Sequence, residues 1–130
     1  RSRGLGDVYK RQLKNILADV DNIDTFVFDE IDTGISGRTA QKVAEKMLRV
    51  AKKHQILCIT HLPQIAAMAD NNYLIEKSSN NETTRTNIVE LYDEKVYNEL
   101  ARLIGGAEIT KATLEAAKEM KLMANRLKEN

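Results

Sequence analysis

The chain has 130 residues, which is enough for one folded domain with a hydrophobic core. Its 20 Lys and Arg residues nearly balance 19 Asp and Glu residues, so the overall charge indicates neither a nucleic acid nor a membrane as partner. No apolar run reaches the ~18 residues of a membrane span, and the amino terminus lacks the apolar core of a signal peptide. One cysteine, Cys58, excludes an internal disulfide framework. We therefore expect a soluble, cytoplasmic α/β protein.

Strands and helices alternate in the first half of the chain. A short helix is expected over residues 13–20, and the apolar run at 25–28 predicts a strand that is buried on both faces. Apolar residues recur at helical spacing over 38–53, and Ser36 is placed to cap that helix. A second apolar strand is expected at 55–60. This order is that of a parallel strand–helix–strand crossover.

The second half adds a hairpin and further helices. After a short helix over 62–70, strands at 72–77 and 84–91 flank a polar turn and predict a β-hairpin. One helix should then stop at Gly105 and Gly106, and another should start after Thr110 as its N-cap. Basic residues of this last helix are balanced by glutamates, which indicates a solvated face; they are Lys118, Lys121, Arg126 and Lys128.

The first strand runs directly into an acidic cluster in "TFVFDEIDTGISG", residues 25–37. Ligands bind at the carboxyl ends of strands in open α/β sheets. An apolar strand followed by Asp29 and Glu30 has the Walker B pattern of nucleoside triphosphatases. There the first carboxylate holds Mg²⁺, and the second orients or deprotonates the attacking water. A strand end with solvated acids is the alternative interpretation.

His61 follows the second predicted strand in "LCITH" and should lie at the same edge of the sheet. A polar side chain there is suited to contact a γ-phosphate and to respond to its loss. The alternative is a strand-end histidine that is hydrogen-bonded to a loop. Because one crossover helix separates His61 from Asp29 and Glu30, the two signals together favour a site for a nucleoside triphosphate and Mg²⁺.

Three longer segments carry a family resemblance: "TFVFDEIDTGISGRTAQKVAEKM", "HQILCITHLPQIAAMAD" and "ELARLIGGAEITKATLEAAKEM". From about Asn15 to its end, the chain resembles the carboxyl-terminal part of the RecN family, bacterial DNA double-strand-break repair ATPases related to SMC and ABC proteins. Other ABC and SMC proteins usually place Leu-Asp in the loop where this chain has "TGISG". The resemblance implies the carboxyl-terminal lobe of an ABC/SMC-type P-loop ATPase head, with parallel strands, crossover helices, a β-hairpin and carboxyl-terminal helices.

The resemblance also implies roles for individual residues. Asp29 matches the Walker B magnesium ligand, Glu30 the catalytic glutamate and His61 the switch histidine. The D-loop, which crosses to the partner head in the family's nucleotide-sandwiched homodimer, would contain Asp32, Thr33 and Gly34. DNA would be a partner of the intact protein, which would be a nucleoid-associated protein of the cytoplasm.

Two motifs of the family are absent from the printed sequence. It contains no G-x-x-x-x-G-K-S/T phosphate loop (Walker A), and "RSRGLGDVYKRQ" stands where the signature motif should be. We expect residues 1–12 to be foreign to the family sequence and residues 13–130 to be a partial ATPase head; a divergent family member is the alternative. The intact protein should hydrolyse ATP, whereas this chain alone should be inactive without an amino-terminal lobe that carries Walker A.

Three alternatives stay open at this point. The chain could be a head fragment of another SMC/ABC-type ATPase. Glu30 and Asp32 form an acid-x-acid pair, as in Mg²⁺-dependent nucleases and topoisomerase-type domains, although such sites usually need a further upstream glutamate. The chain could also be a non-enzymatic interaction fragment, whose exposed sheet edge drives association.

Overall fold

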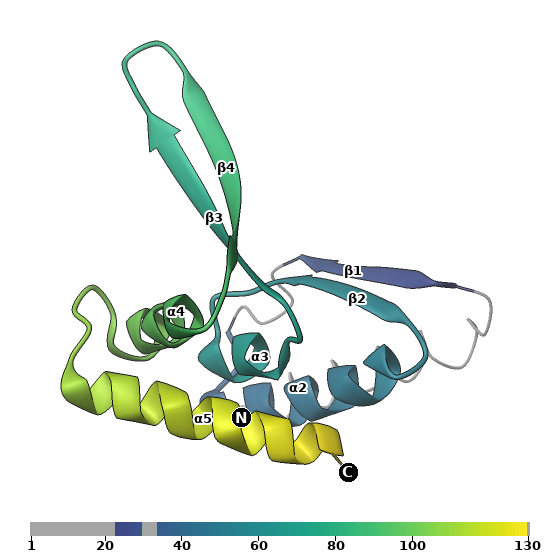
Figure 1. The fold of residues 1–130 in the computed structure, drawn as a ribbon. Helices are drawn as coiled ribbons and strands as arrows, with labels where there is room; N and C mark the ends of the chain where they lie inside the picture. The colour runs from purple at the N-terminus through teal and green to yellow at the C-terminus, as the bar shows by residue number, and fades with distance from the viewer. Residues whose placement is uncertain (1–22, 30–33, 130) are drawn as a thin grey trace.

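The computed structural model describes residues 23–29 and 34–129 (Figure 1). Its elements are β1 (Thr25–Asp29), α2 (Gly37–Ala51), β2 (Gln55–Ile59), α3 (Pro63–Met68), β3 (Asn72–Ser79), β4 (Thr84–Leu91), α4 (Glu94–Gly105) and α5 (Lys111–Glu129). The predicted order of strands and helices is therefore confirmed from residue 25 onward. The helix expected over 13–20 and the segment 1–12 lie outside the described residues.

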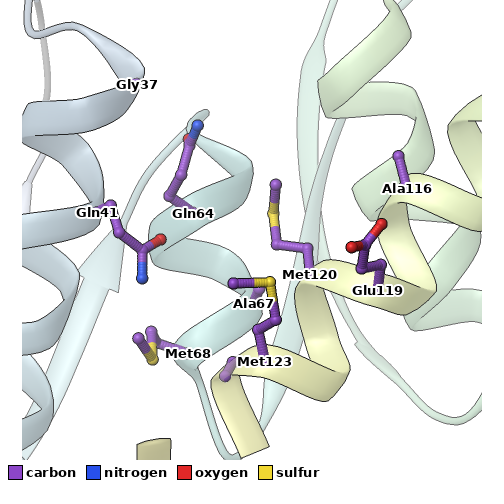
Figure 2. Close-up of a pocket in the computed structure, with 10 residues that line it drawn as sticks. Gly37, Gln41, Gln64, Ala67, Met68, Ala116, Glu119, Met120 and Met123 are labelled. Carbon is purple, nitrogen blue, oxygen red and sulfur yellow. The ribbon is translucent and has the colours of Figure 1, made fainter.

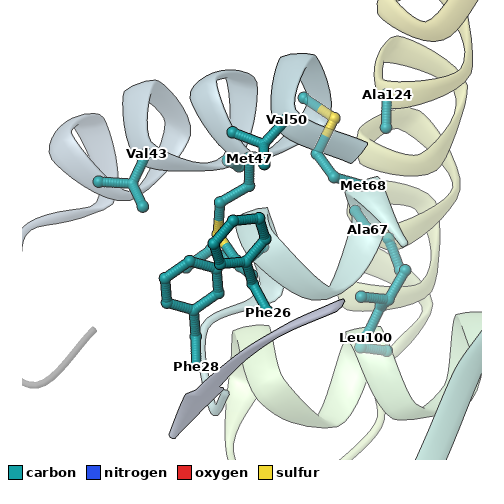
Figure 3. Packing of buried hydrophobic residues seen from close by; sticks show 13 residues of the cluster. Phe26, Phe28, Val43, Met47, Val50, Ala67, Met68, Leu100 and Ala124 are labelled. Atoms are coloured by element: carbon teal, nitrogen blue, oxygen red, sulfur yellow. The ribbon is translucent and has the colours of Figure 1, made fainter. Parts of the chain in front are cut away.

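A two-stranded parallel sheet of β1 and β2 lies above the helices, with α2 as the crossover between its strands (Figure 1). Its register pairs Thr25 with Gln55 and Asp29 with Ile59. On β1 the alternate residues Phe26 and Phe28 are buried, and their rings stack with centroids 6.4 Å apart. Figure 3 shows both rings next to Met47 of α2, so one face of the sheet is packed against the helices.

The opposite face of the sheet is uncovered. Val27 is 66% exposed, and Leu57 and Ile59 on β2 are 50% and 42% exposed. The prediction that the first strand is buried on both faces is therefore wrong for the described part of the chain. The reason is that the described helices α2, α3 and α5 lie on one side of the sheet, and no described element covers the other (Figure 1). We call the side chains of Val27, Leu57 and Ile59 the open face.

Helix α3 connects the packing of the other helices. It contacts α2, α4 and α5, and its residues Ile65, Ala67 and Met68 are buried in the same hydrophobic cluster as the two phenylalanines. Small side chains are fully buried on the carboxyl-terminal helices, as at Ala101 on α4 and Ala117 on α5. Because such residues leave room for neighbouring backbones, α4 and α5 pack closely on α3 although α3 is only six residues long.

The predicted helix caps are confirmed. Ser36 precedes α2, and its Oγ accepts a hydrogen bond of 3.4 Å from the backbone N–H of Thr39. Thr110 precedes α5, and its Oγ1 accepts one of 3.1 Å from the N–H of Thr113. Gly106 ends α4 with φ +86°, a left-handed conformation that favours glycine.

The hairpin of β3 and β4 extends away from the helices and beyond the sheet (Figure 1). Its register runs from Asn72 opposite Leu91 to Ser79 opposite Thr84, so β3 continues two residues past the predicted end at Lys77. Exposed apolar side chains lie along one of its faces; they include Tyr73, Ile75 and Ile88.

Two lysines of α5 cap the end of α3. Lys121 Nζ donates hydrogen bonds to the carbonyl oxygens of Ala67 (3.0 Å) and Ala69 (2.8 Å). Lys128 Nζ donates to Ala69 O at 3.0 Å and forms an ion pair with Asp70 at 3.0 Å. The expected solvated face is therefore wrong for these two lysines, because a helix end presents carbonyl groups that lack intrahelical donors. Burial, together with the nearby charge of Lys128, lowers the pKa of Lys121.

We expect Lys121→Met to lower the free energy of unfolding by about 1–2 kcal/mol, because the carbonyls of Ala67 and Ala69 lose charged donors while the aliphatic stem is kept. Urea unfolding of the chain measures this change. Lys118→Met on the exposed side of the same helix should change it by less than about 0.5 kcal/mol. Equal losses in the two variants would show that the cap contributes nothing.

Gly34 has φ +80°, and a side chain there would be strained although no atom lies within 4 Å of an added β-carbon. Gly34→Ala should therefore lower the free energy of unfolding by about 1 kcal/mol through backbone strain alone. Gly34→Asn should lower it less, because Asn tolerates left-handed backbone better. The same urea experiment compares the two, and a larger loss for Asn would argue against backbone strain as the cause.

Candidate functional site

Asp29 is the last residue of β1 and its side chain is exposed. Side chains alternate along a strand, so Asp29 lies on the same side of the sheet as Val27 and opposite Phe28. Its partner in the register is Ile59, the last residue of β2. The Asp29 carboxylate therefore stands at the carboxyl edge of the sheet, at the end of the open face.

His61 lies just beyond the carboxyl end of β2 and is exposed. The turn that carries it is held locally: the N–H of Leu62 donates a hydrogen bond of 3.0 Å to Thr60 Oγ1, and Pro63 begins α3. The parallel register thus brings Asp29 and His61 to one edge of the sheet, as the order of the elements predicts. Their chemical roles remain predictions.

The rest of the predicted site leads from β1 to α2. Glu30, Asp32 and Thr33 lie outside the described residues. Gly34 is described, exposed, and in the left-handed conformation noted above. Ser36 then caps α2, so the segment after Asp29 ends at the amino-terminal end of that helix.

An exposed carboxylate at this edge suits a hard cation. Within residues 23–29 and 34–129, no three His, Cys, Asp or Glu side chains are grouped so as to hold a metal ion by themselves. Mg²⁺ in phosphate-transfer sites takes one or two carboxylates and completes its shell with water and substrate phosphates. Asp29 fits such a shared shell and does not fit a dedicated protein cage.

Gln64 lies in the first turn of α3, and no sequence motif predicts a role for it. Its Nε2 lies 3.0 Å from the position that a β-carbon on Gly37 would take, and its Oε1 is buried without a hydrogen-bond donor among the described residues. The "LPQIA" motif contains this glutamine, but its contact with α2 depends on how two helices pack. Sequence spacing carries no signal for such a contact.

A groove of about 420 Å³ lies beside Gln64, between α2, α3 and α5 (Figure 2). Its lining is mainly apolar, with three methionines, and consists of Gly37, Gln41, Gln64, Ala67, Met68, Ala116, Glu119, Met120, Met123 and Ala124. Neither Asp29 nor His61 belongs to it. The groove is therefore a feature of helix packing, separate from the edge of the sheet.

None of the described helices is long and apolar enough to cross a membrane. No protein-family model matches the chain. Among solved structures, an SMC ATPase described for ATP-driven dimerization and DNA-stimulated activation matches with a TM-score of 0.53 at 22% identity, over 71% of this chain and 55% of that one. At this identity the match shows the fold, which is that of an SMC-type ATPase.

Curated relatives give the family. DNA repair protein RecN of Halalkalibacterium halodurans is 43% identical over 118 residues, and that of Bacillus subtilis is 41% identical over 116 residues. RecN of Vibrio cholerae is 36% identical over 121 residues. These matches cover 91%, 89% and 92% of this chain but 21%, 20% and 22% of the relatives. The chain spans about a fifth of the length of these relatives, and it belongs to the RecN family.

Proposed function

We propose that this chain is the Walker B part of an ATPase head in a RecN-type DNA repair protein, with ATP and Mg²⁺ as ligands. The observation that carries the proposal is the register of β1 and β2, because it puts Asp29 and the His61 turn at one carboxyl edge. The intact protein would bind and hydrolyse ATP during recombinational repair of DNA double-strand breaks. It would work as a homodimer of heads on DNA, in the cytoplasm with the nucleoid.

Each residue would have a separate task. Asp29 would hold Mg²⁺, and its exposed carboxylate supports this role. When bound, Mg²⁺ neutralises charge on the phosphate oxygens. Glu30 would orient the attacking water and accept its proton, while His61 would contact the γ-phosphate. Asp32, Thr33 and Gly34 would reach toward the partner head.

The head would be completed by an amino-terminal lobe that carries the phosphate loop. The open face of the sheet supports this, because contiguous exposed apolar side chains mark interaction surfaces. The separate hairpin sheet carries further exposed apolar side chains, Tyr73, Ile75 and Ile88, and the chain spans about a fifth of the length of its relatives. This chain alone would then be inactive, since the phosphate loop supplies most of the charge neutralisation on the phosphoryl group.

We expect no ATP turnover by this chain alone and turnover after it is mixed with an amino-terminal RecN segment that carries the phosphate loop and signature motif. In that mixture Glu30→Gln should lower turnover about 10²-fold or more and leave ATP binding intact, because the amide cannot accept the proton. Glu82→Gln, in the exposed hairpin turn, is the matched control.

Two results would count against the proposal. A folded, associated mixture without turnover would mean that the acids are not competent here. Loss of ATP binding in Glu30→Gln would assign that residue a structural role. Mg²⁺-dependent DNA cleavage by the chain alone would instead support the nuclease alternative.

His61→Ala should lower turnover in the same mixture by about 10-fold or more, because a polar contact to the reacting phosphate is lost. His54→Ala provides the comparison, since His54 precedes β2 at the opposite edge and packs edge-on against Phe26. Thermal melts correct for any loss of folding in either variant. Similar turnover in the two variants, at equal folded fractions, would remove His61 from the proposed site.

A further inference from the structure

The helices that follow β1 and β2 in the chain, α2 and α3, contact each other near their amino-terminal ends. Gly37 is the first residue of α2, and Gln64 lies in the first turn of α3. A β-carbon on Gly37 would lie 3.0 Å from Gln64 Nε2, which is closer than ordinary van der Waals contact. Figure 2 shows Gln64 at this end of the groove, between Gln41 of α2 and Met120 of α5.

Packing alone does not explain a glutamine at position 64. Its Oε1 is buried, and no described residue donates a hydrogen bond to it. Most of the surrounding groove is apolar, with Met68 and Met120 among its lining residues. A methionine would fill the same space without a buried, unsatisfied oxygen. Residues that break a packing rule in this way are expected at functional positions.

The neighbours of Gln64 connect it to the candidate site. The His61 turn leads directly into α3, and the hydrogen bond from Leu62 N–H to Thr60 Oγ1 holds this turn next to the first turn of α3. Gly37 in turn ends the segment that begins at Asp29. The Gln64–Gly37 contact is therefore one of the contacts between the two helices that follow β1 and β2 in the chain.

We infer that Gln64 is a positioning residue: its carboxamide sets the spacing between the His61 turn and the amino-terminal end of α2. The inference rests on the proposed function, because it assigns Gln64 to the alignment of that site. Gln64 touches neither nucleotide nor water in this role. It acts through the amino-terminal ends of α2 and α3, the helices that follow β1 and β2.

The first test is Gln64→Met in the RecN-type head completed by its phosphate-loop lobe. Loss of the amide should lower kcat about tenfold and change the KM for ATP less than about twofold, because alignment matters most in the transition state. The same variant should raise Tm by about 2–4 °C, since a buried unsatisfied oxygen is removed. Gln41→Met, which alters another glutamine of the groove, should leave kcat unchanged.

The second test is a double-mutant cycle. Gly37→Ala should lower kcat, because its methyl group displaces the carboxamide of Gln64. In the background of Gln64→Ala, the same methyl meets no amide and should have no further effect, so the double variant should equal Gln64→Ala alone. Additive losses would overturn the inference, as would a Gln64→Met head that is less stable or fully active.

The proposed function and the role of Gln64 can be tested separately. An unaltered completed head without turnover would overturn the proposed function and this inference with it. An active unaltered head in which Gln64→Met keeps normal kcat would overturn only the coupling by Gln64.

Discussion

The one-sided burial of the β1–β2 pair is the constraint on which the rest of the structure depends. Phe26 and Phe28 stack with each other and pack toward α2 and α3, so the odd-numbered residues of β1 must face the other way. Asp29 follows this alternation and is directed to the uncovered side. The burial of Phe26 and Phe28 therefore sets the side of the sheet on which Asp29, the candidate metal ligand, lies.

Helix α3 fixes the segment that follows the second strand, β2. It has only six residues, too few for a helix to be stable without tertiary contacts. Its carboxyl-terminal carbonyls are held by Lys121 and Lys128 of α5, and its amino-terminal end is fixed by Pro63 and the Thr60 turn. Helix α5 therefore supports the segment that presents His61, although it is not part of the sheet.

Local features of this fold could be predicted from the sequence because local rules decide them. The strand–helix–strand order, the hairpin and the caps at Ser36 and Thr110 all follow from spacing and side-chain type. The open face could not be predicted. The apolar pattern of a strand is the same whether its outer face, here at Val27, is covered by this chain or by another segment. Lys121 and Gln64 were missed for a related reason: their partners, the carbonyls of α3 and Gly37, are distant in sequence.

Because Asp29 lies at the end of the open face, docking of a lobe on that face would also change the surroundings of Asp29. A lobe that covers Val27 and Leu57 removes water from apolar side chains, which favours its docking. The same lobe removes water beside Asp29, and electrostatic interactions strengthen as the local dielectric falls. Docking of the lobe and removal of water beside Asp29 would then occur in the same step. Asp29 is exposed in this chain, and its carboxylate would lose its hydration water only when such a lobe covered the open face.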